Sequence, residues 1–184
     1  MLIKKLQKHY IGKKMFKNLG FTISELITCV AILAILVTFG IPHLRELIIS
    51  NEAKQLKRTL TIHIQKSKFD AQIYQKNVTL CASHDLQTCG NNWNQGIISF
   101  IDTNNNRQRD PSETLLYALP LNYKHGTLEW RGTLRINSVT FQGNTGLPRG
   151  SNGSFFYCSN SPQYHTRIKL SQMGHLTPER LTSC

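Results

Sequence analysis

The sequence predicts an α+β protein in which one long N-terminal helix packs on a domain of antiparallel strands, arranged as a sandwich or a curled sheet. Three observations support this fold class. An apolar stretch occupies residues 21–42, apolar residues then recur at every third or fourth position up to residue 74, and short β-like runs fill the chain from residue 77. The 184 residues are enough for one domain of ordinary size.

The charge of the chain is unevenly distributed. Of the net charge of +12, half comes from six lysines within residues 1–20, where no acidic residue occurs. The rest of the chain is only moderately basic. With 40% apolar and 17% charged residues, the composition is typical of a folded chain rather than a disordered one.

The apolar stretch at 21–42, FTISELITCVAILAILVTFGIP, carries a single charged residue, Glu25. Its length is about that of a helix that crosses a bilayer, roughly 20 residues. The lysines that precede it predict a cytoplasmic N-terminus and a periplasmic C-terminal domain. Because no small-x-small cleavage site follows the stretch, we expect it to be retained as a transmembrane helix in the inner membrane. This disfavours a soluble cytosolic enzyme.

The order Gly20, Phe21, Thr22 and then Glu25 at the start of this stretch resembles the class III signal of type IV pilins. In that family a prepilin peptidase cuts after the glycine and N-methylates the next residue. The resemblance implies that residues 1–20 are a cleaved leader and that Phe21 becomes the methylated N-terminus. A carboxylate in hydrocarbon costs about 3 kcal/mol unless it is paired. Glu25 therefore needs a partner, and the amine of a neighbouring subunit's first residue would serve in assembly. The alternative is a plain signal anchor.

An amphipathic continuation of the helix is predicted over residues 43–76, since Pro42 should kink rather than end the helix. Together the two segments form one helix from about residue 24 to 75, roughly 75 Å long at 1.5 Å per residue. The apolar face is predicted to hold Ile49, Ala53, Leu56, Leu60, Ile64, Ser67, Ala71 and Tyr74. The opposite face is predicted to hold Lys54, Lys57, Arg58, Lys66 and Lys68. A solvated basic face is the favoured interpretation, and binding of an acidic polymer is the alternative.

The β domain is predicted over residues 77–184. Its expected strands are 77–82, 96–101, 114–119, 127–131, 138–142, 154–158 and 167–171. Loops rich in Asn, Gly, Ser and Pro separate them, and no crossover helix intervenes, so neighbouring strands should pair antiparallel.

Four of the five cysteines, Cys81, Cys89, Cys158 and Cys184, fall in the predicted periplasmic domain, where disulfides persist. Four cysteines allow three connectivities. We favour Cys81–Cys89, which closes a local loop, and Cys158–Cys184, which ties the C-terminus to a core strand. A zinc site is disfavoured because no C-x-x-C occurs. Cys29, in the apolar stretch, is interpreted as a small packing residue.

Several segments of the β domain follow one another in an order that resembles the FimT/GspH family of minor pilins and pseudopilins. They are VTLC at 78–81, WNQGIISFID at 93–102, VTFQGNTGLPRGSNGSFFYC at 139–158 and RIKLSQMGHL at 167–176. The resemblance covers residues 15–176. It implies a pilin-like fold with a long helix on two sheets, no enzymatic activity, no cofactor, and other major and minor pilins as partners. The implied function is to prime or join a type IV pilus, or alternatively a type II secretion pseudopilus.

FimT-type members can also bind DNA during natural transformation, through a G-R-x-R element after the last strand. Here the corresponding residues 174–177 are Gly-His-Leu-Thr, so both arginines are missing. Other basic residues would have to contact double-stranded DNA, and alternate spacing places Arg167 and Lys169 on one side of a strand. The candidate DNA-binding residues are Arg149, Arg167, Lys169, His175 and Arg180. The alternative is a scatter of solvated basic residues.

One polar segment has the spacing of a calcium-binding loop. Asp102, Asn104, Asn106 and Glu113 occupy positions one, three, five and twelve of the EF-hand pattern. Arg107 stands where the pattern requires glycine, and no helices flank the segment. We therefore favour a polar hairpin loop whose Asn and Asp side chains form turns, with weak calcium binding as the alternative. No catalytic arrangement of residues stands out in the sequence.

Overall fold

The computed structural model describes residues 20–184, so residues 1–19 of the predicted leader lie outside it. The chain divides into two compact units, residues 1–41 and residues 42–184, and each is described by itself. Helix α1, Ile23–Tyr74, contributes to both units, and Pro42 lies inside it. The single long helix predicted from the sequence is confirmed within one residue at each end.

A capping box begins α1. The Thr22 hydroxyl accepts a hydrogen bond from the backbone N–H of Glu25 at 3.3 Å, and the Glu25 carboxylate accepts one from the N–H of Thr22 at 2.8 Å. This reciprocal arrangement satisfies two of the N–H groups that a helix start leaves free. Glu25 thus has a local role within its own chain.

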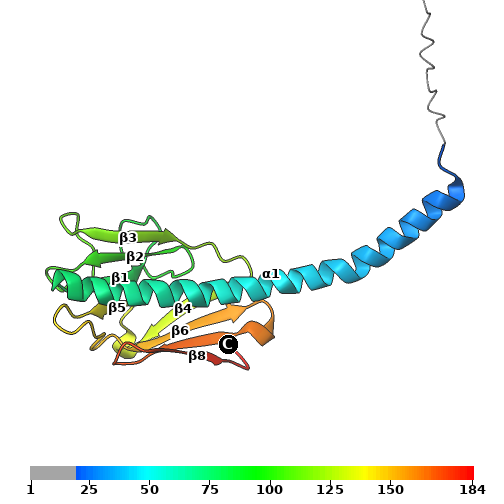
Figure 1. Cartoon of the computed structure of the whole chain (residues 1–184). Helices are drawn as coiled ribbons and strands as arrows, with labels where there is room; N and C mark the ends of the chain where they lie inside the picture. The colour runs from blue at the N-terminus through cyan, green and yellow to red at the C-terminus, as the bar shows by residue number, and fades with distance from the viewer. Residues whose placement is uncertain (1–19) are drawn as a thin grey trace, which may run out of the picture. The chain divides into compact units, whose positions relative to one another are not determined.

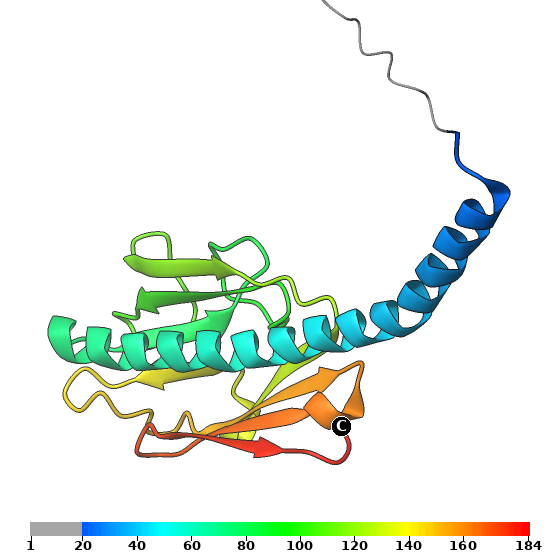
Figure 2. The same ribbon diagram turned by 45° about the vertical axis from the view of Figure 1, so that its right-hand side comes forward.

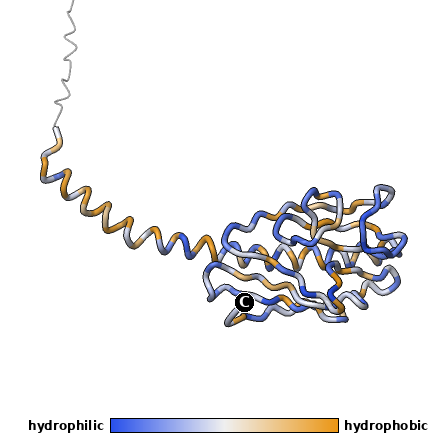
Figure 3. The backbone as a smooth tube through the Cα atoms, turned by 180° about the vertical axis from the view of Figure 1, so that it is seen from behind, coloured by the Kyte–Doolittle hydropathy of each residue, from blue (hydrophilic) through white to orange (hydrophobic). Residues whose placement is uncertain are grey.

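In the first unit, the apolar side chains of α1 are exposed. Every large apolar side chain from Phe21 to Ile41 is at least 53% exposed. Figure 3 colours this part of the chain mostly as hydrophobic. The helix is long and apolar enough to cross a membrane.

In the second unit, one face of α1 packs on the β domain. Its buried residues are Ile49, Ser50, Ala53, Leu56, Leu60, Ile64, Ser67 and Ala71. Seven of these were predicted from their spacing of three and four. Tyr74 was also expected on this face but is 49% exposed, because it lies in the last turn, where the chain leaves the helix for the first strand.

Two four-stranded antiparallel sheets form the β domain. The first sheet has the order β3-β2-β1-β5 and the second has the order β4-β6-β7-β8. The first comprises β1 Val78–Ala82, β2 Gly96–Ile101, β3 Leu115–Pro120 and β5 Ser138–Phe141. The second comprises β4 Gly126–Gly132, β6 Gly153–Ser159, β7 Thr166–Leu170 and β8 Leu176–Arg180. The C-terminal half of α1 runs along both sheets, with β1 to β3 on one side of it and β4, β6 and β8 on the other (Figures 1 and 2).

Strand β8 is the one strand among residues 77–184 that the sequence analysis did not predict. It contains Pro178 and shows no alternation of buried and exposed residues. Proline cannot donate a hydrogen bond to a neighbouring strand and is therefore confined to sheet edges, which is where β8 lies.

The main core joins α1 to both sheets through residues such as Leu60, Leu80 and Phe155. A smaller cluster of Cys81, Ile98 and Phe100 lies apart from it, with Leu86 and Cys89 of the 83–95 loop packed against it. Strands β1 and β2 are buried at every position, because the main core covers one face and this loop the other.

The disulfides join Cys81 to Cys89 and Cys158 to Cys184, with Cα atoms 5.6 and 5.8 Å apart. These are the pairs that the sequence analysis favours. The first holds the 83–95 loop over the small cluster, and the second ties the end of the chain to β6.

Candidate functional site

The predicted processing residues lie at the start of the described chain. Gly20 and Phe21 are exposed, and a Cβ atom added to Gly20 would meet no atom within 4 Å. Glu25 is also exposed, and its carboxylate bonds only to Thr22 of its own chain within the described residues.

Arg167 and Lys169 share one face of the second sheet, as their alternate spacing predicted. Their register partners are Phe156 and Ser154 on β6, and we call this surface the outer face. Arg167 lies 5.5 Å from the centre of the Phe156 ring and 3.8 Å from the Glu179 carboxylate.

The outer face carries little free positive charge. Besides the pair of Arg167 with Glu179, Arg131 pairs with Glu129 at 2.8 Å. Lys169 is thus the one cation among these three without an acidic partner in the described residues. This partial neutralisation weakens the face as a site for phosphates.

Arg180 is not part of this face, contrary to the cluster expected from the sequence. In the register of β7 and β8 it lies opposite Thr166, which places it on the other face from Arg167 and Lys169. There Arg180 lines a groove of about 260 Å³ together with Lys54 and Lys57 of α1. Glu179 also lines the groove.

The same side of the molecule continues to the turn between β7 and β8. Gly174 has a φ of +74° in this turn, a conformation that favours glycine. The Lys68 ammonium would lie 3.5 Å from a Cβ atom on Gly174, and Pro148 is equally close. Arg149 and His175, which follow Pro148 and Gly174, are both exposed.

We define the basic edge as Lys54, Lys57, Lys68, Arg149, His175 and Arg180. None of the ion pairs among residues 20–184 involves these side chains. Lys54 and Lys68 are fourteen residues apart on α1, about 21 Å at 1.5 Å per residue. Apart from His175, the edge is therefore a line of basic side chains without ion-pair partners among residues 20–184, a shape that suits a polyanion better than a small anion.

The sequence analysis wrongly assigned the three lysines of the basic edge, Lys54, Lys57 and Lys68, to the helix face opposite the core. At about 100° per residue, Lys57 lies only about 40° from the buried Ala53 around the helix axis. Lys57 and Lys68 therefore flank the core on the β8 side, and a helical projection of the sequence could have found this. Lys66 lies on the other flank, 5.0 Å from the centre of the Tyr117 ring.

That other flank carries a polar contact between α1 and the first sheet. The Ser67 hydroxyl lies 2.6 Å from the Tyr117 hydroxyl and 3.2 Å from that of Ser99. Tyr117 Oη also donates to the backbone carbonyl of His63 at 2.9 Å. Burial, with the nearby Lys66 ammonium, lowers the pKa of the His63 imidazole below its ordinary value.

Glu52 links α1 to the second sheet. Its carboxylate accepts hydrogen bonds from the Tyr157 hydroxyl at 2.7 Å and from the backbone N–H groups of Lys124 and His125 at 3.0 and 2.9 Å. Burial acts to raise the pKa of Glu52, but these hydrogen bonds outweigh it and lower the pKa. No local sequence pattern could have indicated this contact, since its partners are 72 to 105 residues away.

The loop at 102–113 turns on its polar side chains, as the sequence analysis favoured. Asn104 and Asn106 each accept a backbone N–H two residues ahead, at 3.1 and 2.7 Å. The Glu113 carboxylate accepts the N–H groups of Thr103 and Asp110. Within residues 20–184, no three His, Cys, Asp or Glu side chains gather as a metal-binding group.

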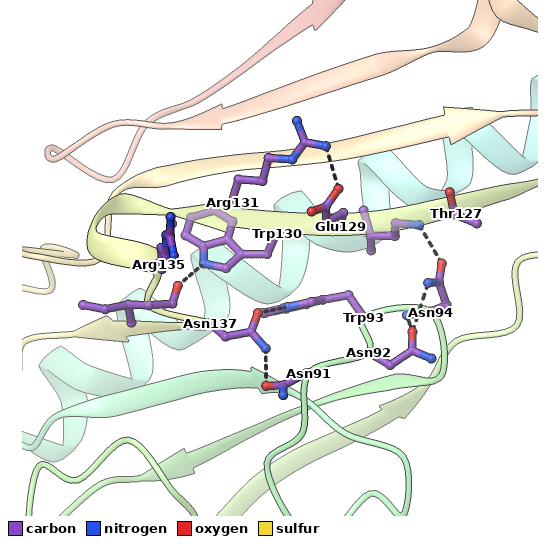
Figure 4. Close-up of a pocket in the computed structure, with 13 residues that line it drawn as sticks. Asn91, Asn92, Trp93, Asn94, Thr127, Glu129, Trp130, Arg131, Arg135 and Asn137 are labelled. Atoms are coloured by element: carbon purple, nitrogen blue, oxygen red, sulfur yellow. Dashed lines mark hydrogen bonds and ion pairs between the residues drawn. The ribbon is translucent and has the colours of Figure 1, made fainter. Parts of the chain in front are cut away.

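A cavity of about 940 Å³ lies beside β4, and four asparagines and two tryptophans are among the residues that line it (Figure 4). Trp93 donates to the side chain of Asn137, and Trp130 donates to the carbonyl of Ile136. Asn94 accepts the N–H of Leu128, so it caps part of the edge of β4.

Comparison with known proteins identifies the family. The family model described as type II transport protein GspH matches residues 58–174. No curated protein matches the chain.

Two solved structures of the type IV minor pilin FimU of Pseudomonas aeruginosa (strain PAO1) are similar to the chain. The crystal form in space group P21 has a TM-score of 0.52 and 18% identity, covering 70% of this chain and 89% of FimU. The form in space group P65 has a TM-score of 0.49 and 16% identity, covering 70% and 90%. At this identity the first likeness shows the fold, which is pilin-like. Because the family model spans more than half of the sequence, the chain belongs to the GspH/FimT family of minor pilins and pseudopilins.

Proposed function

We propose that this chain is a minor pilin that is trimmed between Gly20 and Phe21, held in the inner membrane by residues 21–42, and then built into a type IV pilus or its tip. The observation that carries the proposal is the exposed apolar half of α1, with no buried side chain from Phe21 to Ile41. A bilayer before assembly, and the helices of other pilins afterwards, would cover it.

Glu25 supports the same proposal. It is the one charged residue in the apolar stretch, and its carboxylate bonds only to Thr22 within the described residues. A carboxylate in hydrocarbon costs about 3 kcal/mol unless a partner compensates. The N-methylated amine of Phe21 in a neighbouring pilin would be such a partner, and the pairing would favour assembly over the free membrane state.

The test is to express Glu25→Val from the native locus and to compare membranes with sheared filaments by immunoblot. We expect normal trimming and normal amounts in the membrane, with depletion from filaments of about tenfold or more, as for the loss of about 1.4 kcal/mol. Glu46→Gln, in the second unit, is the matched control and should assemble normally. Filaments that contain the Glu25→Val chain at the level of the unsubstituted chain would refute the proposed role.

A second function, binding of double-stranded DNA, is favoured by the basic edge. Its unpaired cations extend over about 21 Å, which corresponds to about six base pairs at 3.4 Å per step. We propose that Lys54, Lys57, Lys68 and Arg180 contact phosphates, with Arg149 and His175 at one end. Such contacts bind DNA without reading its sequence.

DNA binding is tested by fluorescence anisotropy with the mature chain in non-ionic detergent at several salt concentrations. Four phosphate contacts predict a slope of log K against log salt of about −3.6, and removing three should reduce its magnitude by about 2.7. The test variant is Lys54→Ala/Lys57→Ala/Arg180→Ala, and the control is Arg131→Ala/Arg167→Ala/Lys169→Ala, which removes the same charge from the outer face. An equal loss in both variants, or retained binding in the first, would contradict the assignment to the basic edge.

The alternative is a pseudopilin of a type II secretion system, which the description of the matched family as a type II transport protein favours. Deletion of the gene distinguishes the two roles. Loss of pilus-dependent motility or transformation supports the pilus, whereas loss of protein secretion with normal pili supports the pseudopilus.

A further inference from the structure

The loop at 102–113 contains acidic side chains that form no ion pair among the described residues. Asp102, Asp110 and Glu113 lie in it, and none takes part in an ion pair among residues 20–184. Two arginines belong to the same loop but reach elsewhere. Arg107 donates to the Ser151 hydroxyl at 3.1 Å, and Arg109 donates to Gln87 at 2.8 Å.

Two of these carboxylates are buried. Asp102 is 1% exposed and Glu113 is 5% exposed. Buried charges in proteins are as a rule paired with an opposite charge or bound to a metal ion, because an isolated buried charge is costly. The loop meets this requirement only in part, through hydrogen bonds from Thr79, Thr103 and backbone N–H groups.

One oxygen of Asp102 has no hydrogen-bond partner within residues 20–184. Asp102 Oδ2 accepts hydrogen bonds from the Thr79 hydroxyl at 2.8 Å and from the backbone N–H of Arg107 at 3.1 Å. The bond from Arg107 ties the Asp102 carboxylate to the opposite side of the turn. Asp102 Oδ1 is buried there without a hydrogen-bond donor.

The side-chain oxygens of Asn104 and Asn106 are held in place by backbone N–H groups of the same loop. Asn104 Oδ1 and Asn106 Oδ1 each accept a single backbone N–H, and an amide oxygen has a second lone pair to offer. The backbone of Asn105 and Arg107 is left-handed, with φ of 61° and 63°, so the turn for which the EF-hand pattern uses glycine is made here by Arg107.

We propose that this loop binds one calcium ion, through Asp102 Oδ1, the amide oxygens of Asn104 and Asn106, and the Glu113 carboxylate. Backbone carbonyls and water would complete the shell. Calcium takes only oxygen ligands and accepts amides beside carboxylates, so it does not need three acidic side chains at one point. Histidine and cysteine, whose nitrogen and sulfur ligands would favour zinc, are absent from residues 102–113.

Calcium would stabilise this end of the β domain. The loop follows β2 directly, its Arg107 contacts the loop before β6, and its Arg109 contacts the loop after β1. An ion bound at Asp102 would therefore stabilise three connecting loops at once. The inference does not depend on the pilus, on secretion or on DNA binding.

The test is thermal unfolding and calorimetric titration of the mature chain in detergent, with EDTA, CaCl₂ or MgCl₂. We expect one site with a Kd of about 10⁻⁴ to 10⁻³ M, typical of extracellular calcium modules, and a rise in Tm that saturates with calcium. Asp102→Asn and Glu113→Gln should each weaken binding about tenfold or more and remove the rise in Tm, while their unfolding in EDTA remains cooperative.

The matched control is Asp85→Asn, in the loop after β1. Asp85 caps its own turn by accepting the N–H groups of Gln87 and Thr88, so its loss should lower Tm in EDTA without changing the response to calcium. Failure of calcium to raise Tm, an equal rise with magnesium, or an equal response in Glu113→Gln would overturn the proposal.

Discussion

The two halves of α1 differ in what covers them. From residue 42 onward one face of the helix is buried against two sheets, and Leu56 and Leu60 have no exposed surface. From Phe21 to Ile41 the same helix buries no residue, although this half is the more apolar one. Within the described part of its own unit, residues 20–41, the more hydrophobic half thus buries no side chain.

This difference teaches where the stability and the function of the protein reside. The covered half is part of the folded domain, so changes there should alter its unfolding. Changes in the uncovered half should leave that unfolding unchanged. They should instead alter how the chain associates with the bilayer or with other pilins. The following predictions separate the two halves, beginning with the largest effect.

Truncation of a buried leucine should show the largest difference in stability between changes in the two halves of α1. Leu60→Ala is expected to lower the free energy of unfolding by about 3 kcal/mol, because it leaves a cavity in the core. Leu33→Ala, at a position 58% exposed, should leave it unchanged. Urea unfolding in detergent, followed by fluorescence of the buried Trp93, measures both. Equal destabilisation by the two variants would mean that the halves do not differ.

Glu52 tests how the covered half is fixed to the second sheet. Glu52→Gln should cost about 1.5 kcal/mol, since it removes the charge that three donors share. Glu46→Gln, which removes the charge from the acceptor of a single hydrogen bond, donated by the Ser161 hydroxyl at 3.2 Å, serves as control in the same urea experiment and should cost less. A larger loss of stability in Glu46→Gln would mean that Glu52 is not the main link between α1 and the second sheet.

The smallest expected effect is a dependence of stability on pH, which arises from His63 in the covered half. Because burial and Lys66 lower its pKa in the folded state, the unfolded chain takes up a proton first as the pH falls. This contribution to stability is present above the ordinary histidine pKa of about 6.5 and is lost as the pH falls below it.

Urea unfolding between about pH 7.5 and 5.5 measures the decline, a window centred on the ordinary histidine pKa. His63→Phe keeps a ring beside Tyr117, 4.7 Å away in the present structure, and should flatten the profile. Burial raises the pKa of the nearby Asp70 carboxyl, which acts in the opposite direction, and its contribution should remain in the variant. An unchanged profile in His63→Phe would assign the dependence to another group.

The elements of the fold were predictable because their signals are local. The three- and four-residue spacing from Ile49 to Ala71 located the buried face of α1, and seven of the eight strands lie within two residues of their predicted bounds. β8 was missed because Pro178 and exposure on nearly all sides removed the alternating pattern.

The arrangement of the basic residues was less predictable. Whether Arg180 lies beside Arg167 depends on the parity of the β7–β8 register, and whether Lys57 flanks the core depends on its angle around the helix. The calcium site proposed at residues 102–113 was likewise only partly predictable from the sequence. The spacing from Asp102 to Glu113 could be read from the sequence, but the unpartnered oxygen of Asp102 required the fold.

Cys29 allows the most direct test of the central claim, that the uncovered half of α1 is covered by a bilayer or by other pilins in the cell. It is a free cysteine, and it is exposed in the uncovered half. The measurement is labelling with a membrane-impermeant maleimide in cells with a permeabilised outer membrane, and then in sheared filaments. We expect Cys29 to remain unlabelled in both, while Lys57→Cys, in the second unit, is labelled at least in the cells. Labelling of Cys29 as fast as of Lys57→Cys would contradict the account.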